Sequence, residues 1–377
     1  PVIPSMAIPR TDSGSAAPDG LMAEMAGIPV PMQQLSAYVA YLDSEPIIVA
    51  TEGEESGVKI FTLDDVRRNT LPADIEKLLF EKLEQGLAKA NSAFDYWHYA
   101  SIDALQLIVS EGDSNKICLI DHFCGAAELR FPHTLIFQKG MGRLSVVERF
   151  RSAEEDNPSF VSHALCGKAQ TRLDYHILQN LNLSSRMIRT SQLEAVRNSQ
   201  MSHFEAHVGA GWVKGLVHAD IPANGVDALL NGMYFAKGEQ HYDIATVQSH
   251  TAGNSGSRSL YKGAVDESAY SVFRGLIDIA PKSEKTDAYL TNNNLVLQDG
   301  ARADSIPTLE IHTDDVKCSH GSTTGRLLPD HVFYLQSRGF SQEEARTLLV
   351  EGFLLEPASI TPDFLQQELQ QLVAQKI

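Results

Sequence analysis

The sequence is poor in cysteine and in positive charge. Its 377 residues include four cysteines, Cys118, Cys124, Cys166 and Cys318, and none forms a C-x-x-C pair. So few thiols exclude a disulfide framework and favour a reducing compartment. Lysine and arginine together number 31 against 48 aspartate and glutamate residues, which gives a net charge of −17. Because nucleic acids and anionic membranes attract cationic proteins, this balance argues against both kinds of partner.

Several other signals are absent. No apolar run approaches the ~18–20 residues that span a bilayer, and the first residues lack the layout of a secretory signal, so we expect a cytoplasmic protein. There is no Walker A sequence, no H-E-x-x-H motif and no nucleophile elbow, which leaves an ATPase or a zinc protease unsupported. The segment Gly209–Gly215 approximates a dinucleotide-binding loop, but its third glycine is one place late and no helical pattern follows. We interpret it as a turn between strands.

The middle of the chain has the sequence pattern of β-strands. Short β-prone runs separated by turn-forming residues extend from about Leu105 to His320. The runs are Leu105–Val109, Ile117–Ile120, Thr134–Phe137, Leu144–Phe150, His203–Val208, Trp212–His218, Tyr242–Gln248, Ser271–Asp278, Leu295–Gln298 and Leu309–His312. They predict one large β unit, and a sandwich, a barrel and a parallel β-helix all remain open.

Helical patterns flank this β region. The first ~30 residues are rich in proline, serine, glycine and alanine, and we expect a loosely ordered arm there. A helix is expected to begin near Pro72. Near the other end, Pro329–Arg338, a capping box at Ser341–Glu344 and the segment Thr361–Asp363 predict three further helices.

These patterns divide the chain into three regions. They are an N-terminal arm and helical region (1–97), a β core (98–322) and a C-terminal helical region (323–377).

Most histidines and cysteines have an ordinary structural interpretation. His203 and His207 lie four apart and share one face of a strand, while His241 and His250 flank another strand. We interpret them as solvated or hydrogen-bonded side chains on a β surface. The cysteines Cys118, Cys124 and Cys166 have apolar or small neighbours, and we expect them to behave as small hydrophobic residues.

The segment Leu309–His320 is different because its apolar residues do not keep to one face of a strand. Its apolar residues are odd-numbered up to Ile311 and even-numbered from Val316. Since a strand alternates with a period of two, this predicts a bulge or bend near Asp314.

Beyond this bend, Cys318 and His320 are two residues apart and therefore on one face of an extended strand. A thiolate beside an imidazole suits a soft or borderline metal such as iron or zinc. Two ligands do not complete a site, so a metal here would need donors from elsewhere, for instance from another chain. A role in packing or at an interface is the alternative.

Five stretches of the chain carry family-specific motifs. They are Val272–Ile279, Lys285–Leu295, Pro307–Gly325, Val332–Ala345 and Gly352-Phe353. Together they resemble the SufB/SufD family of the SUF iron–sulfur cluster assembly machinery. The resemblance is strong over 240–355, weaker across the earlier strands and poor before about residue 70.

Two differences favour the SufD branch over the SufB branch. In SufB a cysteine falls within the stretch that corresponds to Thr291–Asn294, where this chain has only asparagine after the threonine. Where SufB usually reads Glu-His-Glu-Ala, this chain reads Cys318-Ser-His-Gly321.

The resemblance implies a mainly β fold, a right-handed parallel β-helix core flanked by N- and C-terminal helical regions. It also implies a complex with a SufB-like paralogue, which would join at the end of the β-helix near Cys318–His320. A SufC-like ABC-type ATPase would bind the C-terminal helices, about 326–377. The isolated chain would be able to pair with a second copy of itself. This chain itself would be neither a catalyst nor a nucleotide-binding protein.

The resemblance further implies that His320 contributes to a transient iron–sulfur cluster site shared with the partner subunit, with Cys318 close by. Two other functions remain open. A carbohydrate-active β-helix enzyme of the polysaccharide-lyase kind would need clustered carboxylates, and the chain offers only Asp314-Asp315. A self-sufficient cluster carrier would need grouped thiolates, which four scattered cysteines do not supply.

Overall fold

The computed structural model describes residues 34–377 apart from 52–56, 91–92, 125–127, 153–157 and 168–171. The chain divides into Pro1–Gln34 and Leu35–Ile377, and the described helices and strands all belong to the second unit. The arm expected over the first ~30 residues lies outside the described residues.

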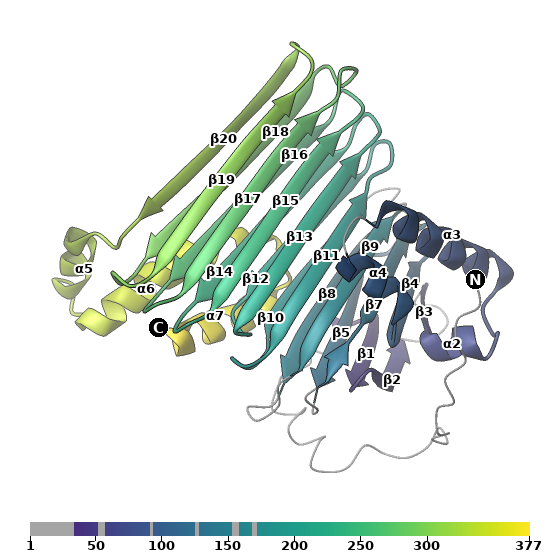
Figure 1. Cartoon of the computed structure of the whole chain (residues 1–377), viewed down its shortest axis with the longest axis horizontal. Coiled ribbons are helices and arrows are strands. Elements are labelled where there is room, and N and C mark those ends of the chain that lie inside the picture. The colour runs from purple at the N-terminus through teal and green to yellow at the C-terminus, as the bar shows by residue number, and fades with distance from the viewer. Residues whose placement is uncertain (1–33, 52–56, 91–92, 125–127, 153–157, 168–171) are drawn as a thin grey trace. The chain divides into compact units, whose positions relative to one another are not determined.

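Two sheets contain the strands (Figure 1). In spatial order, sheet A contains β2 (Glu45–Thr51), β1 (Ala37–Leu42), β5 (Lys116–Cys124), β8 (Arg143–Ser152), β10 (Arg172–Asn180), β12 (Gln200–His207), β14 (Asp227–Ala236), β16 (Gly256–Val265), β18 (Thr286–Val296) and β20 (Val316–Gly325). Sheet B contains β19 (Arg302–Ile311), β17 (Tyr270–Ile279), β15 (His241–His250), β13 (Trp212–Ile221), β11 (Arg186–Glu194), β9 (Ser159–Gly167), β7 (Pro132–Gln138), β4 (Ala104–Ser110) and β3 (Val58–Thr62), with β6 (Leu129–Arg130) paired to β9.

From β8 onward the chain alternates between the two sheets, and each strand pairs in parallel with the strand one coil later. Arg172 pairs with Gln200, Gln200 with Asp227, and Asp227 with Gly256. Among the described strands only β1 with β2 and β3 with β4 pair in antiparallel fashion. This coil is a parallel β-helix flanked by helices, as the resemblance implies, and it excludes the sandwich and the barrel.

The predicted β-prone runs fall on strands, with one exception. Leu295–Gln298 overlaps only the last two residues of β18, which begins at Thr286. The polar composition of Thr286–Asn294 hid this strand, although its alternate residues are buried. Strands β1, β2 and β3 precede the first long helix, in a region where the sequence pattern indicated only helix and loop.

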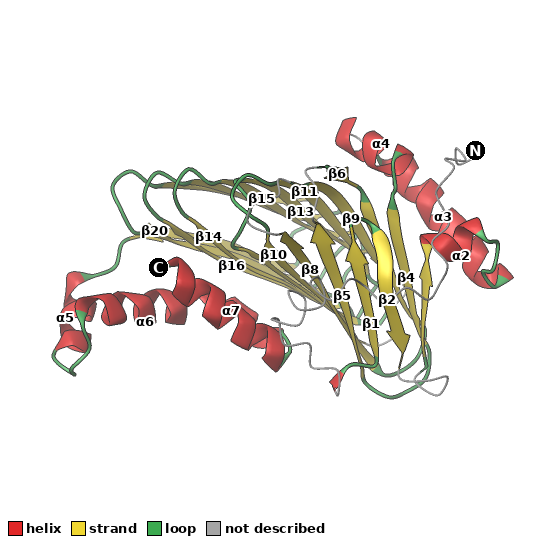
Figure 2. Cartoon of the chain, turned by 90° about the horizontal axis from the view of Figure 1, so that it is seen from below, coloured by secondary structure: helices red, strands yellow, loops and turns green. Residues whose placement is uncertain are grey.

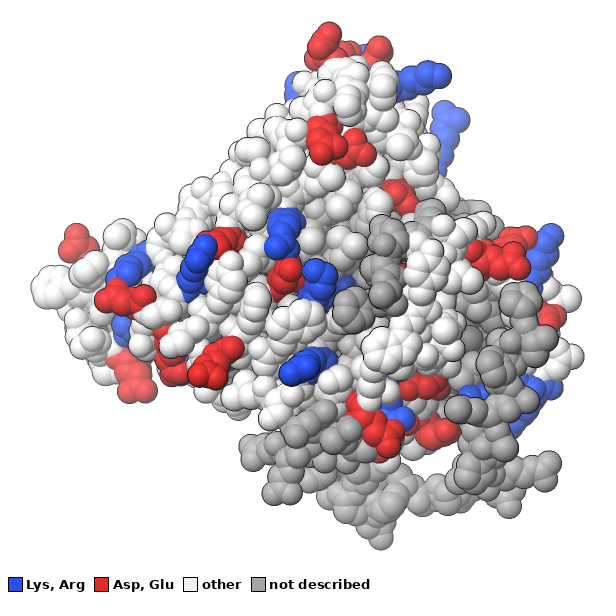
Figure 3. Space-filling view, viewed as in Figure 1, with Lys and Arg blue, Asp and Glu red and all other residues white. Residues whose placement is uncertain are grey.

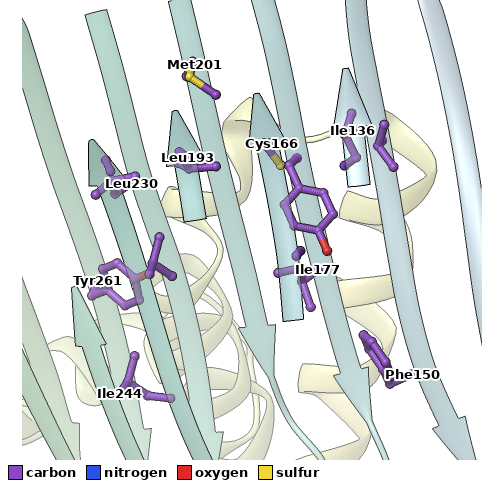
Figure 4. Packing of buried hydrophobic residues seen from close by; sticks show 14 of the residues in the cluster. Ile136, Phe150, Cys166, Ile177, Leu193, Met201, Leu230, Ile244 and Tyr261 are labelled. Carbon is purple, nitrogen blue, oxygen red and sulfur yellow. The ribbon is translucent and has the colours of Figure 1, made fainter. Parts of the chain in front are cut away.

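Side chains alternate between the inside and the outside of the coil because strands have a period of two. The burial pattern of β15 alternates along all of its residues from His241 to His250. The inward side chains of both sheets form one hydrophobic core that reaches from β1 to β19. Figure 4 shows Ile177, Leu193 and Ile244 among the side chains of this core.

Two tyrosines and two glycines interlock in this core. Gly232 of β14 pairs with Tyr261 of β16, and Tyr234 pairs with Gly263. A Cβ atom at Gly232 would lie 2.2 Å from Cε1 of Tyr261, and one at Gly263 would lie 2.0 Å from Cε2 of Tyr234. Each tyrosine ring therefore occupies the space that the neighbouring glycine leaves empty.

Helices flank the two sheets (Figure 2). They are α2 (Leu63–Arg67), α3 (Ala73–Lys89), α4 (Ala93–Ala100), α5 (Pro329–Gln336), α6 (Gln342–Leu354), the 3-10 helix η3 (Glu356–Ile360) and α7 (Asp363–Lys376). The predicted capping box is confirmed, because Ser341 and Glu344 bond each other's backbone amides at the start of α6. Helix α3 packs Ile75, Leu78 and Leu79 on sheet B at β4, β7 and β9.

Buried charges hold the C-terminal helices on sheet A. Arg149 donates to Asp121 from both Nε and Nη2 at 2.5 Å, and its Nη1 donates to Glu368 of α7 at 2.9 Å. The amide of Asn231 donates to the carbonyl oxygen of Pro357 in η3 at 3.1 Å. Because a buried charge is costly when unpaired, these contacts fix where the helices lie on the sheet.

The interlocked pairs generate a stability prediction. We expect Gly232→Ala and Gly263→Ala each to lower the free energy of unfolding by about 1–3 kcal/mol, because the new methyl group displaces a buried ring. Gly325→Ala is the matched control, since Gly325 also lies in a strand and a Cβ there has no atom within 4 Å. Urea unfolding measures all three, and equal effects at all three positions would contradict the packing described.

Candidate functional site

The last coil of the β-helix has open edges. Among the described strands, β19 pairs only with β17 and β20 only with β18. Each therefore leaves a row of backbone N–H and C=O groups available along its outer edge, which is a template for another chain. Ile306 and Ile311 of β19 are 50% and 39% exposed, so the open end also carries apolar surface.

Cys318 and His320 lie on β20 at this open end. Cys318 pairs in register with Ala288, and His320 pairs with Leu290. The two side chains share the inward phase of the strand. Cys318 is half-buried against the hydrophobic core, whereas His320 is exposed because no further coil covers it in the described structure.

The change of parity of the apolar residues before Cys318 comes from a bend, one of the two causes predicted. The chain bends at Asp314-Asp315, where it passes from one strand to the next. Ile311 ends β19 in sheet B, and Val316 begins β20 in sheet A. The inward-facing residues change from odd-numbered to even-numbered because the chain passes from sheet B to sheet A between these two strands.

Cys318 and His320 can offer one sulfur and one nitrogen donor. Burial raises the pKa of the Cys318 thiol, so a metal or a base must take its proton before it can bind as a thiolate. Within the described part of the chain, no group of three histidine, cysteine, aspartate or glutamate side chains is arranged to hold a metal ion. A metal bound by Cys318 and His320 would therefore take its other ligands from outside these residues.

The other cysteines lie in the core. Cys118 and Cys166 are fully buried, and burial raises the pKa of Cys118 to about 12 and raises that of Cys166 as well. They act as small hydrophobic residues, as predicted. The side chain of Cys124 lies outside the described residues.

Asparagine side chains support β20 from the neighbouring strand. Asn292 and Asn294 of β18 are buried, and the Asn294 amide donates to Oδ1 of Asn292 at 2.8 Å. Tyr234 of β14, two coils before β18, donates to Oδ1 of Asn294 at 2.6 Å. On the opposite face, Thr323 of β20 donates to Oδ1 of Asn293 at 2.8 Å. The asparagine run is thus a hydrogen-bonded support for the last coil.

Sequence reasoning missed a polar network inside the β-helix. The fully buried carboxylate of Glu148 accepts hydrogen bonds from Arg189 at 3.1 Å and Thr134 at 2.8 Å, and also from Tyr175. Nε2 of His122 lies 2.8 Å from the same carboxylate. Burial alone would raise the pKa of Glu148, but Arg189, His122 and Tyr175 outweigh it and hold the pKa at about 2.

A second polar group lies further along the interior on β12. Tyr261 donates to Glu205 at 2.9 Å, and Nε2 of His207 lies 3.3 Å from the same carboxylate. The interpretation of His203 and His207 as surface histidines is therefore wrong, since both are buried and face inward. The sequence could have revealed this, because both histidines are an even number of residues from the apolar Met201, which is buried, and therefore share its face of the strand.

The fold and the open end can now be compared with known proteins. The family model for the SufBD core domain of the SUF system of FeS cluster assembly matches residues 122–353. The chain belongs to this family. The matched residues include both interior polar groups, the asparagine support, the open last coil and most of helix α6.

Curated relatives agree with this assignment. An iron–sulfur cluster assembly SufBD family protein of Mycobacterium leprae is 38% identical over 165 residues, which cover 42% of each chain. The iron–sulfur cluster assembly protein SufD of Escherichia coli is 39% identical over 136 residues, covering 36% of this chain and 32% of the relative. SufD of Bacillus subtilis is 32% identical over 142 residues, covering 37% and 32%. The alignments thus span less than half the length of these relatives.

None of the described helices is both long and apolar enough to cross a membrane.

Several histidines of the described chain are buried. Nε2 of His98 lies 2.8 Å from Nδ1 of His133, and both rings contact His163 beneath α4. Burial lowers the pKa of six histidines. It falls to about 4 for His98, His176 and His250, to about 3 for His163 and His203, and well below 6.5 for His133.

We therefore expect the free energy of unfolding to fall as the pH drops below about 6.5, because the unfolded chain binds protons that the folded chain excludes. Each such histidine contributes up to about 1.4 kcal/mol per pH unit. Urea unfolding at pH 7.5, 6.5 and 5.5 measures the slope. His203→Gln should make it shallower, while His312→Gln, at an exposed position, should leave it unchanged. Identical slopes for the two variants would contradict this assignment.

Proposed function

We propose that this chain is a non-catalytic scaffold subunit of a SUF iron–sulfur cluster assembly complex. It pairs with a SufB-like paralogue through the open end of the β-helix and binds a SufC-like ABC-type ATPase through its C-terminal helices. The single observation that carries the proposal is the open last coil, which presents Cys318 and His320 at an edge within the matched SufBD core.

The open edge supports pairing with a paralogue of the same fold. A second β-helix with the same coil can continue the backbone ladder of β19 or β20, because parallel strands of equal spacing match each other's hydrogen-bonding groups. The exposed apolar residues Ile306 and Ile311 would be buried by such a partner.

The pair of donors supports a shared site for a nascent cluster. A [2Fe–2S] or [4Fe–4S] cluster takes about four protein ligands, and this chain offers two at one place. The cluster is cargo in this scheme, formed at the interface and passed on. Its remaining ligands would come from the partner subunit.

The C-terminal region, 323–377 in our division of the chain, offers a surface for the ATPase. Phe333 and Tyr334 of α5 are 72% and 56% exposed, and Leu328 just before them is 56% exposed. Aromatic residues in such a patch are typical of protein interfaces. The Arg149–Glu368 ion pair and the hydrogen bond from Asn231 to Pro357 hold the helices after α5 on sheet A. A force applied at α5 would therefore be passed to the β-helix.

The matched family is an assembly family rather than one of carbohydrate-active enzymes, and we therefore favour the scaffold over the lyase-like alternative. In this proposal ATP is handled by the partner, and the complex resides in the cytoplasm.

The shared site generates the first functional prediction. His320→Ala in the co-expressed complex should lower the yield of reconstituted cluster at least fivefold, because one nitrogen donor is lost, while the complex still elutes intact. Cluster absorbance after anaerobic reconstitution and size-exclusion chromatography measure the two properties. His312→Ala is the matched control, an exposed histidine outside the strand.

Loss of the complex itself in His320→Ala would make this residue a structural one and overturn the shared site. Cys318→Ala separates the two donors. An unchanged cluster yield in that variant would assign Cys318 to packing and leave His320 as the ligand from this chain.

The ATPase contact generates a second prediction. Phe333→Asp should weaken binding of the SufC-like ATPase at least tenfold, because a charge would be buried in an apolar contact. Leu183→Asp is the matched control, since Leu183 is 67% exposed in the turn between β10 and β11. Calorimetric titration of the folded variants measures both affinities, and equal affinities would contradict docking at α5.

A further inference from the structure

Cys318 and His320 lie at different depths, although they share one face of β20 at the open end. The Cys318 side chain is half-buried, whereas His320 is exposed. No described coil follows β20, so the missing neighbour affects both side chains equally. Their surroundings differ in the coil beneath them, which β17 and β18 form.

Charge does not fix the position of the His320 ring. The segment Cys318–Gly325 contains no aspartate, glutamate, lysine or arginine, and Figure 3 shows mainly uncharged atoms along the edge of the molecule where β20 lies. Within the described chain, no side chain forms an ion pair or a hydrogen bond with the His320 ring. The position of the imidazole is therefore set by packing.

The residues beneath the two donors differ in size. Cys318 pairs in register with Ala288 of β18, and His320 pairs with Leu290. Neighbouring strands lie about 4.8 Å apart, so the side chain of the lower residue limits how far the upper one can sink into the coil. Ala288 has only a methyl group, which leaves room for the Cys318 side chain to pack against the hydrophobic core.

Leu290 crosses the interior of its coil and is held there. Its side chain is buried, and it reaches from sheet A to Gly275 of β17 in sheet B. A Cβ atom at Gly275 would lie 2.1 Å from Cδ1 and 3.1 Å from Cγ of Leu290. The isobutyl group thus fills the space that Gly275 leaves empty, and it forms a fixed floor beneath the imidazole.

We propose that Leu290, seated against Gly275, is a positioning residue that keeps the His320 imidazole at the surface, while the small Ala288 lets the Cys318 thiol recede. This inference rests on the proposed shared site. In that site the imidazole meets an incoming iron ion or partner first, and the thiol is the recessed second donor. Burial also raises the pKa of the Cys318 thiol, so the recessed donor keeps its proton longer.

The first test measures the accessibility of the imidazole in the full chain alone. Diethyl pyrocarbonate acylates exposed histidine rings, and peptide mass spectrometry gives the rate at each histidine. We expect Leu290→Ala to slow modification of His320 about threefold, because the ring sinks into the space of the lost isobutyl group. Leu290→Met, of similar volume, should keep the wild-type rate. The exposed His312, outside the strands, is the reference in every sample.

The second test measures the accessibility of the thiol. Ala288→Val adds two methyl groups beneath Cys318 and should raise its side chain, so alkylation of Cys318 by iodoacetamide should become about threefold faster. The fully buried Cys118 and Cys166 report on folding, since they should stay unmodified in every variant that keeps its core.

An unchanged rate at His320 in Leu290→Ala, with Cys118 and Cys166 still protected, would overturn the proposal. If Leu290→Ala exposes these two cysteines, Leu290→Val decides instead, because it removes only one methylene group. Slower modification of His320 in that variant supports the floor, and an unchanged rate overturns it.

Both rates are measured without a cluster or a partner. They are therefore independent of the cluster yield of His320→Ala in the assembled complex. A confirmed floor together with an unchanged cluster yield in His320→Ala would count against the shared site and leave the packing of Leu290 intact.

Discussion

Backbone hydrogen bonds between a strand and the strand one coil later determine which side chains face inward along β8 to β20. Because the pairing is in register, a residue and its partner in the next coil share a face, and rows of side chains run along the whole coil. The tyrosine–glycine interlock and the asparagine support both follow from this one constraint. A shift of one residue in any strand would bury its outward side chains.

The same constraint explains how the interior tolerates charge. Glu148 is fully buried, yet strands of both sheets bring donors to it, including Arg189 and Tyr175. An isolated carboxylate there would be neutralised by protonation, whereas the network keeps its pKa low. The interior polar groups and the ion pairs beneath α7 thus lie at fixed points of the coil, so they tie the C-terminal helices and the core to one register.

Much of this architecture follows from sequence pattern, and the failures have physical causes. Runs such as Tyr242–Gln248 alternate cleanly and were placed correctly, as was the capping box at Ser341–Glu344. Strand β18 was missed because its inward-facing residues include asparagines. A sequence pattern identifies buried positions by their apolar residues, and an asparagine side chain is polar even when it is buried. Cys318 and His320 were correctly placed on one face of a strand, but the partners of Glu148 could not be found, since they are distant in sequence and meet only through coiling.

Between β8 and β20 the backbone of each coil pairs only with the coils before and after it, so its stability is approximately a sum of nearest-neighbour terms. The coil that carries Cys318 and His320 has a described neighbour on one side only. We therefore expect it to open at a lower free energy than the interior coils, and its amide protons to exchange with solvent sooner than those of β12 or β14. In the proposed complex, a partner stacked on this coil would add the missing neighbour and restrict the motion of the Cys318 and His320 side chains.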